Sequence, residues 1–167
     1  MTIEPRATAP RFAQKQQGMV LLVSLVFLLL LTLLGISSMQ NATLQEKMAG
    51  SVNLRNVSFQ MAEAALRLGE SSIKVKGFSL AKCTTTTRCA PPAEAPAITS
   101  AGTNGTSGVI WTGSAADGFY GIQNLGTTAT PIVRPATCTG PVTLYRVTSV
   151  ATYGTSTSVL ESIYANC

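Results

Sequence analysis

The stretch Met19–Ile36, MVLLVSLVFLLLLTLLGI, decides the fold, because Ser24 and Thr32 are its only hydroxyl residues and it carries no charge. At about 1.5 Å per residue it would span roughly 27 Å as a helix, which is close to the hydrocarbon thickness of a bilayer. A helix can return both hydroxyl groups to its own backbone carbonyls. We therefore expect a transmembrane helix here.

Basic residues orient this helix. Arg6, Arg11 and Lys15 precede it against a single acid, Glu4, whereas the charges just after it cancel. Because short cytoplasmic segments carry the excess of Lys and Arg, we expect the N-terminus in the cytoplasm and the rest of the chain across the membrane. In a bacterial cell the compartment across the membrane is the oxidising periplasm or the space beyond it.

Residues 1–36 admit three interpretations. They could form an uncleaved signal anchor, or a secretory signal cut near Gly35 and Ser37, although a secretory apolar core usually runs about 7–15 residues. The third interpretation is a leader that a prepilin peptidase removes between Gly18 and Met19, so that the whole apolar stretch is retained. The junction KQQG, followed directly by an unbroken apolar run, favours the third interpretation.

The helical pattern continues beyond the apolar stretch. Residues 37–76 contain no proline, and residues of high helix propensity dominate TLQEKMA and FQMAEAALRLGE. Gly77, which follows Lys74 and Lys76, is the expected end of the helix. Apolar residues at three- and four-residue steps predict an amphipathic helix whose stripe packs on a domain of the same chain. The stripe consists of Leu44, Met48, Val52, Leu54, Val57, Met61, Ala65 and Leu68.

Four motifs follow one another between residues 14 and 70. They are QQGMVLLVSLVFLLLLTLLGISS, TLQEKMAG at Thr43–Gly50, NLRN at Asn53–Asn56 and FQMAEAALRLGE at Phe59–Glu70. Together they resemble the N-terminal region of PilX-type minor pilins of bacterial type IV pili. The resemblance implies cleavage after Gly18 and methylation of the new amino group of Met19. The helix positions that carry it are Thr43, Leu44, Gln45, Glu46, Met48, Phe59, Glu63, Ala64 and Leu66.

One position departs from the family pattern. Type IV pilins usually have a glutamate as the fifth residue after the cleavage point, and this chain has Val23 there. In the family that glutamate is thought to neutralise the cationic N-terminus of a neighbouring subunit. Its absence argues against bulk incorporation as a major pilin. It agrees with a place near the tip of a pilus or in an initiating complex.

From about Ala81 the composition changes to Thr, Ser, Gly, Ala and Pro with few charges. We expect loops at Thr84–Thr87, around Pro91, Pro92 and Pro96, and at Thr99–Gly108. Runs of β-branched and aromatic residues predict strands, the last two of which form a hairpin around Gly154. The expected strands are Val109–Thr112, Phe119–Leu125, Val142–Ala151 and Ser156–Ala165.

The expected fold class is therefore α+β and type IV pilin-like. A long N-terminal helix, first transmembrane and then amphipathic, would pack on a small antiparallel β-sheet with disulfide-stapled loops. The expected parts are a prepilin leader at 1–18, a transmembrane or filament-core helix half at 19–42 and an amphipathic helix half at 43–77. A β-rich head outside the cytoplasm would follow at 78–167.

Four cysteines lie in the part of the chain expected outside the cytoplasm, which predicts two disulfides in a domain with a small core. Four cysteines allow three pairings. We favour Cys83–Cys89, which would close a short loop just after the helix, and Cys138–Cys167, which would tie the last residue back across the hairpin. The second bond also resembles the C-terminal disulfide loop of type IV pilins.

Composition and motifs exclude most catalytic and metal-binding classes. The chain has no histidine, no nucleophile motif and no phosphate-binding glycine loop, so we expect neither an enzyme nor a cofactor or metal site. The net charge is +5, from 12 Lys and Arg against 7 Asp and Glu. Bases at Lys74, Lys76, Lys82 and Arg88 could contact phosphate without specificity, so DNA contact stays an open alternative.

The expected function is that of a minor pilin which helps initiate type IV pilus assembly in a minor-pilin complex at the tip. Such a subunit would support piliation, adhesion and twitching motility. Its expected partners are prepilin peptidase, other minor pilins, the major pilin and the inner membrane, with a tip adhesin as a further candidate. It would cross the inner membrane once, with its head in the periplasm, and then enter the extracellular pilus, or fimbrium. The alternatives are a minor pseudopilin of a type II secretion system and a membrane-anchored periplasmic binding domain.

Overall fold

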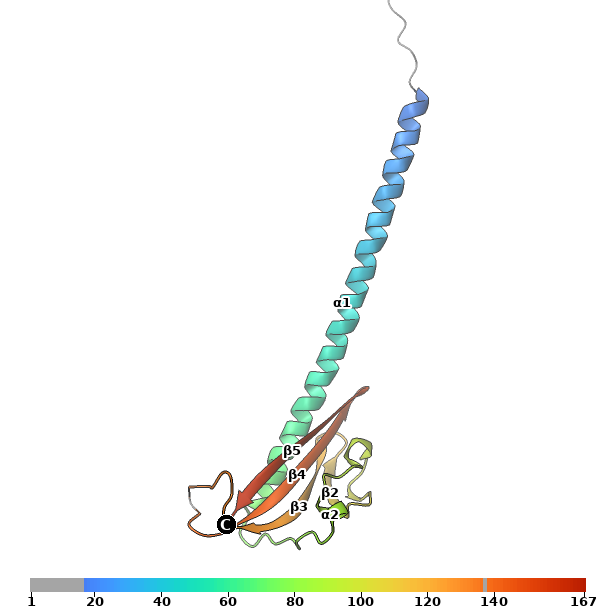
Figure 1. The fold of residues 1–167 in the computed structure, drawn as a ribbon. Coiled ribbons are helices and arrows are strands. Elements are labelled where there is room, and N and C mark those ends of the chain that lie inside the picture. The colour runs from blue at the N-terminus through green and yellow to red at the C-terminus, as the bar shows by residue number, and fades with distance from the viewer. Residues whose placement is uncertain (1–16, 137) are drawn as a thin grey trace, which may run out of the picture. The chain divides into compact units, whose positions relative to one another are not determined.

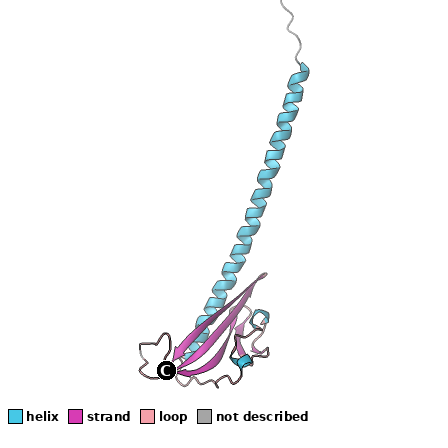
Figure 2. Ribbon diagram, viewed as in Figure 1, coloured by secondary structure: helices cyan, strands magenta, loops and turns pink. Residues whose placement is uncertain are grey.

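The computed structural model describes residues 17–136 and 138–167, and the chain divides into two units, Met1–Lys47 and Met48–Cys167. We call the second the globular unit. Helix α1, Gln17–Ile73, is continuous through the boundary, and Figures 1 and 2 show the elements that follow it. These are α2 (Thr86–Cys89), η1 (Ala95–Ala97), β1 (Gly102–Thr103), β2 (Ile110–Ser114), β3 (Gly118–Thr128), β4 (Val142–Tyr153) and β5 (Ser156–Asn166).

In the first unit the described residues form only α1, and residues 18–47 are exposed throughout. This part of the helix is long and apolar enough to cross a membrane. The two hydroxyls of Met19–Ile36 are satisfied locally, as expected: Ser24 Oγ donates to the Leu21 carbonyl at 2.9 Å, and Thr32 Oγ1 donates to the Leu29 carbonyl at 2.8 Å. Met19–Ile36 therefore presents no unsatisfied hydroxyl to an apolar surrounding.

The globular unit is built on one antiparallel sheet with strand order β1-β2-β3-β4-β5, in which each strand pairs with its neighbours in sequence. The expected hairpin is present, because β4 and β5 pair without a register shift from Thr143 opposite Asn166 to Tyr153 opposite Ser156. Gly154 in its turn has a φ of 58°, which favours glycine. The four expected strands thus exist, with ends shifted by a few residues.

Helix α1 packs one face of this sheet through small residues. Ser58, Ala62, Ala65 and Gly69 are all buried, and they recur at steps of four and three residues. A Cβ on Gly69 would lie only 2.6 Å from Val147 Cγ1, so the glycine lets the helix backbone approach β4 closely. At its C-terminal end the helix packs against a cluster of larger side chains. The cluster consists of Ile73, Tyr145, Val147, Leu66, Phe78, Leu80, Ile122 and Tyr164.

The expected packing stripe was wrong at four of its eight positions: Met48 is 66% exposed and Leu68 is 57% exposed, and Leu44 and Val52 are likewise exposed. Ala65 is buried, as expected, and Leu54, Val57 and Met61 are half-buried. The physical reason is close approach: short side chains let the helix backbone approach the sheet, and the large apolar residues then lie to the sides of the contact or on the outer face.

Hydroxyl and amide groups supplement this contact along β4 and β5, which lie beside α1 in Figure 1. Ser58 Oγ lies 3.1 Å from Ser156 Oγ and 2.8 Å from Ser158 Oγ. Ser149 Oγ donates to the Ala62 carbonyl at 2.7 Å. Farther along, Ser162 donates to Glu70 and Asn166 donates to the Ile73 carbonyl. Hydrogen bonds therefore fix the register of the helix on the sheet, where apolar packing alone would let it slide.

The opposite face of the sheet is covered by the segment between α1 and β2. Ala95, Ile98 and Val109 from this segment form a buried cluster with side chains of the sheet, namely Trp111, Phe119 and Val150. The segment contains short elements where loops were expected: α2 begins within Thr84–Thr87, η1 includes Pro96, and β1 lies within Thr99–Gly108. Each has four residues or fewer and is stabilised by its tertiary contacts, so local propensity did not indicate it.

Helix α1 also ends earlier than expected, at Ile73 rather than near Gly77. Tighter bonds follow, from the Lys74 N–H to the Ser71 carbonyl and from the Val75 N–H to the Ser72 carbonyl. Gly77, with a φ of 89°, then turns the chain back toward the sheet. Phe78 and Leu80 thereby enter the cluster beside Ile73.

Candidate assembly surfaces

The expected processing junction lies at the start of α1. Gly18 and Met19 are both exposed within the first turn, which begins at Gln17. The first N–H groups of a helix have no intrahelical partner, so unwinding this turn to present the peptide bond would cost little. The leader charges Arg6, Arg11 and Lys15 lie outside the described residues.

The apolar half of α1 offers an all-round hydrophobic surface. Val23, at the position where pilins usually have glutamate, is 47% exposed and lies beside other aliphatic side chains of the helix. The sequence places no acid between Gly18 and Gln45. A surface of this kind is stable against lipid or against similar helices, and it would not be stable in water.

The nine helix positions of the family motif are distributed over three environments. Leu66 packs against the buried cluster around Ile73, and Glu63 pairs with Arg67 one turn later. Ala64 lies at the edge of a groove described below. The other six are exposed, and they are Thr43, Leu44, Gln45, Glu46, Met48 and Phe59. Most of the motif therefore does not build the core of this chain.

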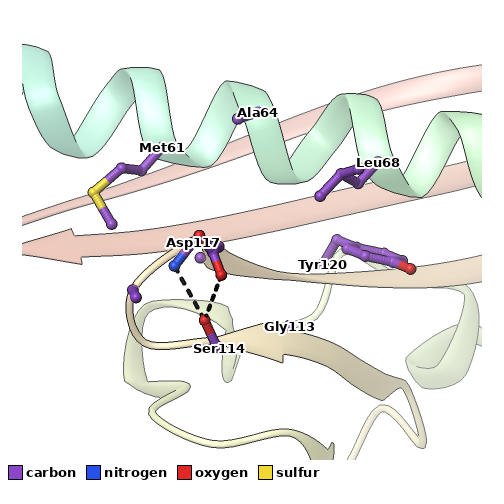
Figure 3. A pocket seen from close by; sticks show the side chains of 9 residues that line it. Met61, Ala64, Leu68, Gly113, Ser114, Asp117 and Tyr120 are labelled. Atoms are coloured by element: carbon purple, nitrogen blue, oxygen red, sulfur yellow. Dashed lines mark hydrogen bonds between the residues drawn. The ribbon is translucent and has the colours of Figure 1, made fainter.

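A groove runs between α1 and the β2–β3 turn, with a volume of about 360 Å³ (Figure 3). Met61 and Leu68 from the helix and Tyr120 from β3 supply its apolar walls. At the turn, the Asp117 carboxylate accepts a hydrogen bond from Ser114 Oγ at 2.8 Å, and the Asp117 N–H donates a hydrogen bond to Ser114 Oγ. Asp117 is the one charged residue that lines the groove, so the groove is apolar with a fixed anion at its rim.

The first disulfide, Cys83–Cys89, closes the loop that includes α2, and buried polar side chains hold this loop on the sheet. Gln123 Nε2 donates to the Arg88 and Ala90 carbonyls at 2.6 and 3.1 Å. Arg146 donates from Nη1 to the Cys89 carbonyl and from Nε to Glu161 at 2.9 Å. Gln123 and Arg146 were not among the residues predicted from the sequence to have a role. Isolated polar residues in predicted strands were the available signal.

The second disulfide, Cys138–Cys167, joins the segment before β4 to the last residue. Both bonds are the pairs favoured from the sequence.

The four basic residues considered for DNA contact do not all line one surface hollow. Lys82 and Arg88 line a common hollow of about 290 Å³ beside Asn124. Lys74 instead places its Nζ 5.6 Å from the centre of the Tyr164 ring, and Lys76 is exposed after the helix. Across residues 17–136 and 138–167, no three Asp, Glu, Cys or His side chains gather as metal ligands would.

Comparison with family models matches residues 17–67 to the model described as PilX N-terminal. Residues 17–67 are similar to the N-terminal region of PilX-type minor pilins. This region makes up just under a third of the chain, and it ends within the part of α1 that packs on the sheet. Comparison with curated proteins finds no match, and comparison with solved structures finds none either.

The PilX-type region thus contains the apolar helix half, the junction at Gly18 and the exposed motif positions. It also contains three of the small residues that contact the sheet, Ser58, Ala62 and Ala65. Ala65 belonged to the expected packing stripe, whereas Ser58 and Ala62 did not, because that stripe was chosen mainly from large apolar side chains. Their spacing of four and three residues, continued by Gly69, was the signal that could have found them.

Proposed function

We propose that this chain is a minor pilin that helps initiate type IV pilus assembly as part of a minor-pilin complex. The match of residues 17–67 to the PilX N-terminal model carries the proposal. The fold supports it, because a long apolar helix continuous with a disulfide-stapled α+β unit is the architecture of a pilin subunit. The proposal makes the chain an assembly subunit without catalytic activity.

The exposed surface of α1 supports assembly as the mechanism. In the membrane, lipid would cover the aliphatic side chains from Met19 to Ile36. On leaving the membrane, the same side chains need other apolar helices, since water would not tolerate them. Exposed motif residues such as Leu44 and Met48 continue this apolar surface along the helix. Helices of neighbouring pilins, both minor and major, are the proposed partners.

The proposed path begins with the N-terminus in the cytoplasm and the globular unit in the periplasm. A prepilin peptidase would cut between Gly18 and Met19 and, by resemblance to the family, methylate Met19. Val23 leaves the subunit without the glutamate that attracts the N-terminus of a neighbour, which supports a place at the tip or in the priming complex. Roles in adhesion and twitching motility would follow from piliation.

The proposal is tested by the mass of the mature chain in its native envelope and in sheared pili. We expect the wild type to begin at N-methyl-Met19 and to be present in sheared pili. Gly18→Asp should leave the chain unprocessed in the membrane and reduce piliation. The matched control is Gly50→Asp, because Gly50 is another exposed glycine of α1 with no atom within 4 Å of an added Cβ. This control should be processed normally.

Two results would contradict the proposal. A wild-type chain that keeps residues 1–18 and occurs only in membranes would indicate an anchored periplasmic domain. Normal piliation with Gly18→Asp would show that pilus assembly does not need the processed subunit.

A further inference from the structure

The segment between β3 and β4 presents two adjacent aliphatic side chains to solvent. Ile132 is 103% exposed and Val133 is 76% exposed. We call this pair the Ile132–Val133 knob. Pro131 and Pro135 flank it and restrict its backbone. Two neighbouring large apolar side chains with so little burial indicate a surface that another molecule covers.

Side-chain and covalent links hold the knob in place. The Arg134 guanidinium donates from Nη2 to the Ala129 carbonyl at 2.6 Å and from Nη1 to the Gly140 carbonyl, so it joins the two ends of the segment. The Cys138 N–H donates to the Pro135 carbonyl at 2.9 Å, and Cys138 is bonded to Cys167. A segment that is already ordered loses less conformational entropy on binding.

The groove and the knob lie at opposite ends of the globular unit. In an antiparallel sheet, the β2–β3 and β4–β5 turns lie at one end and the β3–β4 connection lies at the other. The groove includes the β2–β3 turn, with Met61 and Leu68 on α1 and Tyr120 on β3 (Figure 3). The knob belongs to the β3–β4 connection. One chain therefore cannot place its own knob in its own groove.

The two surfaces match in chemistry and in charge. The knob is aliphatic with Arg134 beside it, and Arg134 is the one charged residue between β3 and β4. The groove is apolar with Asp117 as its one charge. The knob and the groove are thus both apolar and exposed, and the charged groups beside them, Arg134 and Asp117, have opposite signs. This pairing favours contact between a knob and a groove, because contact between two knobs or between two grooves would bring charges of the same sign together.

We propose that the groove of one copy of this chain receives the Ile132–Val133 knob of a second copy. The contact is heterologous, so it leaves a free groove on one copy and a free knob on the other. The inference rests on the proposed assembly function, since it names a contact by which the assembling subunit would recognise a neighbour.

Cysteine cross-linking of the full chain in membranes tests the contact. All four native cysteines are in disulfides, so an introduced thiol is the reactive one. Two differently tagged populations are co-expressed, one with Ile132→Cys and one with Met61→Cys, and are treated with a short bismaleimide. We expect a dimer that carries both tags, at least several-fold above the dimer from either population alone.

The matched control pairs Ile132→Cys with Thr157→Cys, because Thr157 is exposed on β5 and does not line the groove. This pair should give only the background that random encounters of membrane helices produce. Adding Asp117→Arg to the Met61→Cys population should lower the specific dimer several-fold, because Arg134 of the knob would then face a like charge. Retained fluorescence of buried Trp111 shows that each variant is folded.

The contact is refuted if the Met61 and Thr157 partners cross-link equally, if the dimer is unaffected by Asp117→Arg, or if folded variants give no dimer. A subunit processed at Gly18 and found in pili, but without this cross-link, would leave the proposed function standing and remove only this contact. A cross-link in a chain that is not processed at Gly18 would support this contact and contradict the proposed function.

Discussion

Replacing Gly69 by alanine tests how closely α1 approaches the sheet. The new Cβ would lie 2.6 Å from Val147 Cγ1 and 3.0 Å from Tyr120 Cδ2, well inside the usual carbon–carbon contact of about 3.5–4.0 Å. Val147 is completely buried and cannot swing into solvent. Overpacking of this kind costs about 1–3 kcal/mol.

Alanine also favours a helix over glycine by up to about 1 kcal/mol, which partly offsets the clash. Gly50→Ala isolates that gain, because Gly50 lies in the same helix with no atom within 4 Å of an added Cβ. We therefore expect Gly50→Ala to stabilise the globular unit by up to about 1 kcal/mol. Gly69→Ala should be about 1–3 kcal/mol less stable than Gly50→Ala, since the propensity term cancels between the two.

The assay is urea unfolding of the full chain in mild detergent, followed by the fluorescence of Trp111. Trp111 is the single tryptophan and is 1% exposed, on the sheet face opposite α1, so it reports global unfolding rather than the mutated contact. An equal or higher free energy of unfolding for Gly69→Ala than for Gly50→Ala would refute the close approach of helix and sheet.

Three further changes are tested by the same unfolding measurement. Ser58→Ala should lower the free energy of unfolding by about 1–2 kcal/mol, because it removes the hydroxyl between helix and sheet, whereas exposed Ser51→Ala should have little effect. Arg146→Met should lower the free energy of unfolding by about 1.5–3 kcal/mol, because it removes charge-assisted bonds to the Cys89 carbonyl and the Glu161 carboxylate; an unchanged free energy would show that these bonds are dispensable. Replacing Cys138 and Cys167 by serine should lower the free energy of unfolding by about 3–4 kcal/mol, and replacing Cys83 and Cys89 should lower it by about 2–3 kcal/mol. The first bond closes the longer loop, since the sequence separations are 29 and 6. The reverse order of the two losses would contradict the chain-entropy argument.

The exposed large side chains of α1 distinguish surfaces that this chain covers from those that other molecules must cover. Phe59 and Leu68 belong to the globular unit, yet both are about half exposed. The interior of the unit is filled on the α1 side by small helix residues and the cluster around Ile73, and on the other side by the Trp111 cluster. The apolar excess of the chain therefore lies largely on surfaces suited to contacts between molecules.

The sequence by itself determined the long helix, its membrane-compatible half, the β4–β5 hairpin and the favoured cysteine pairs. These features depend on local signals: an unbroken apolar run, alternation of β-branched residues around Gly154, and cysteines placed beside the elements that they tie. The apolar run and the hairpin pattern can be recognised without knowledge of the fold, because each acts between residues close together in sequence; the Cys138–Cys167 pair, 29 residues apart, followed instead from the predicted hairpin and from the resemblance to pilins.

Only the tertiary structure decided which face of α1 packs and which surfaces stay open. The spacing of Ser58, Ala62, Ala65 and Gly69 marks a face of small residues, but only the short distance between helix and sheet decides that this face packs in preference to the larger apolar side chains. Tertiary structure also brings residues far apart in sequence together, as in the bond from Arg146 to the Cys89 carbonyl and in the groove lined by Met61 and Tyr120. It likewise leaves Ile132 of the knob exposed. Packing sets these distances, because close-packed interiors admit short side chains where two backbones meet and displace long ones to the surface.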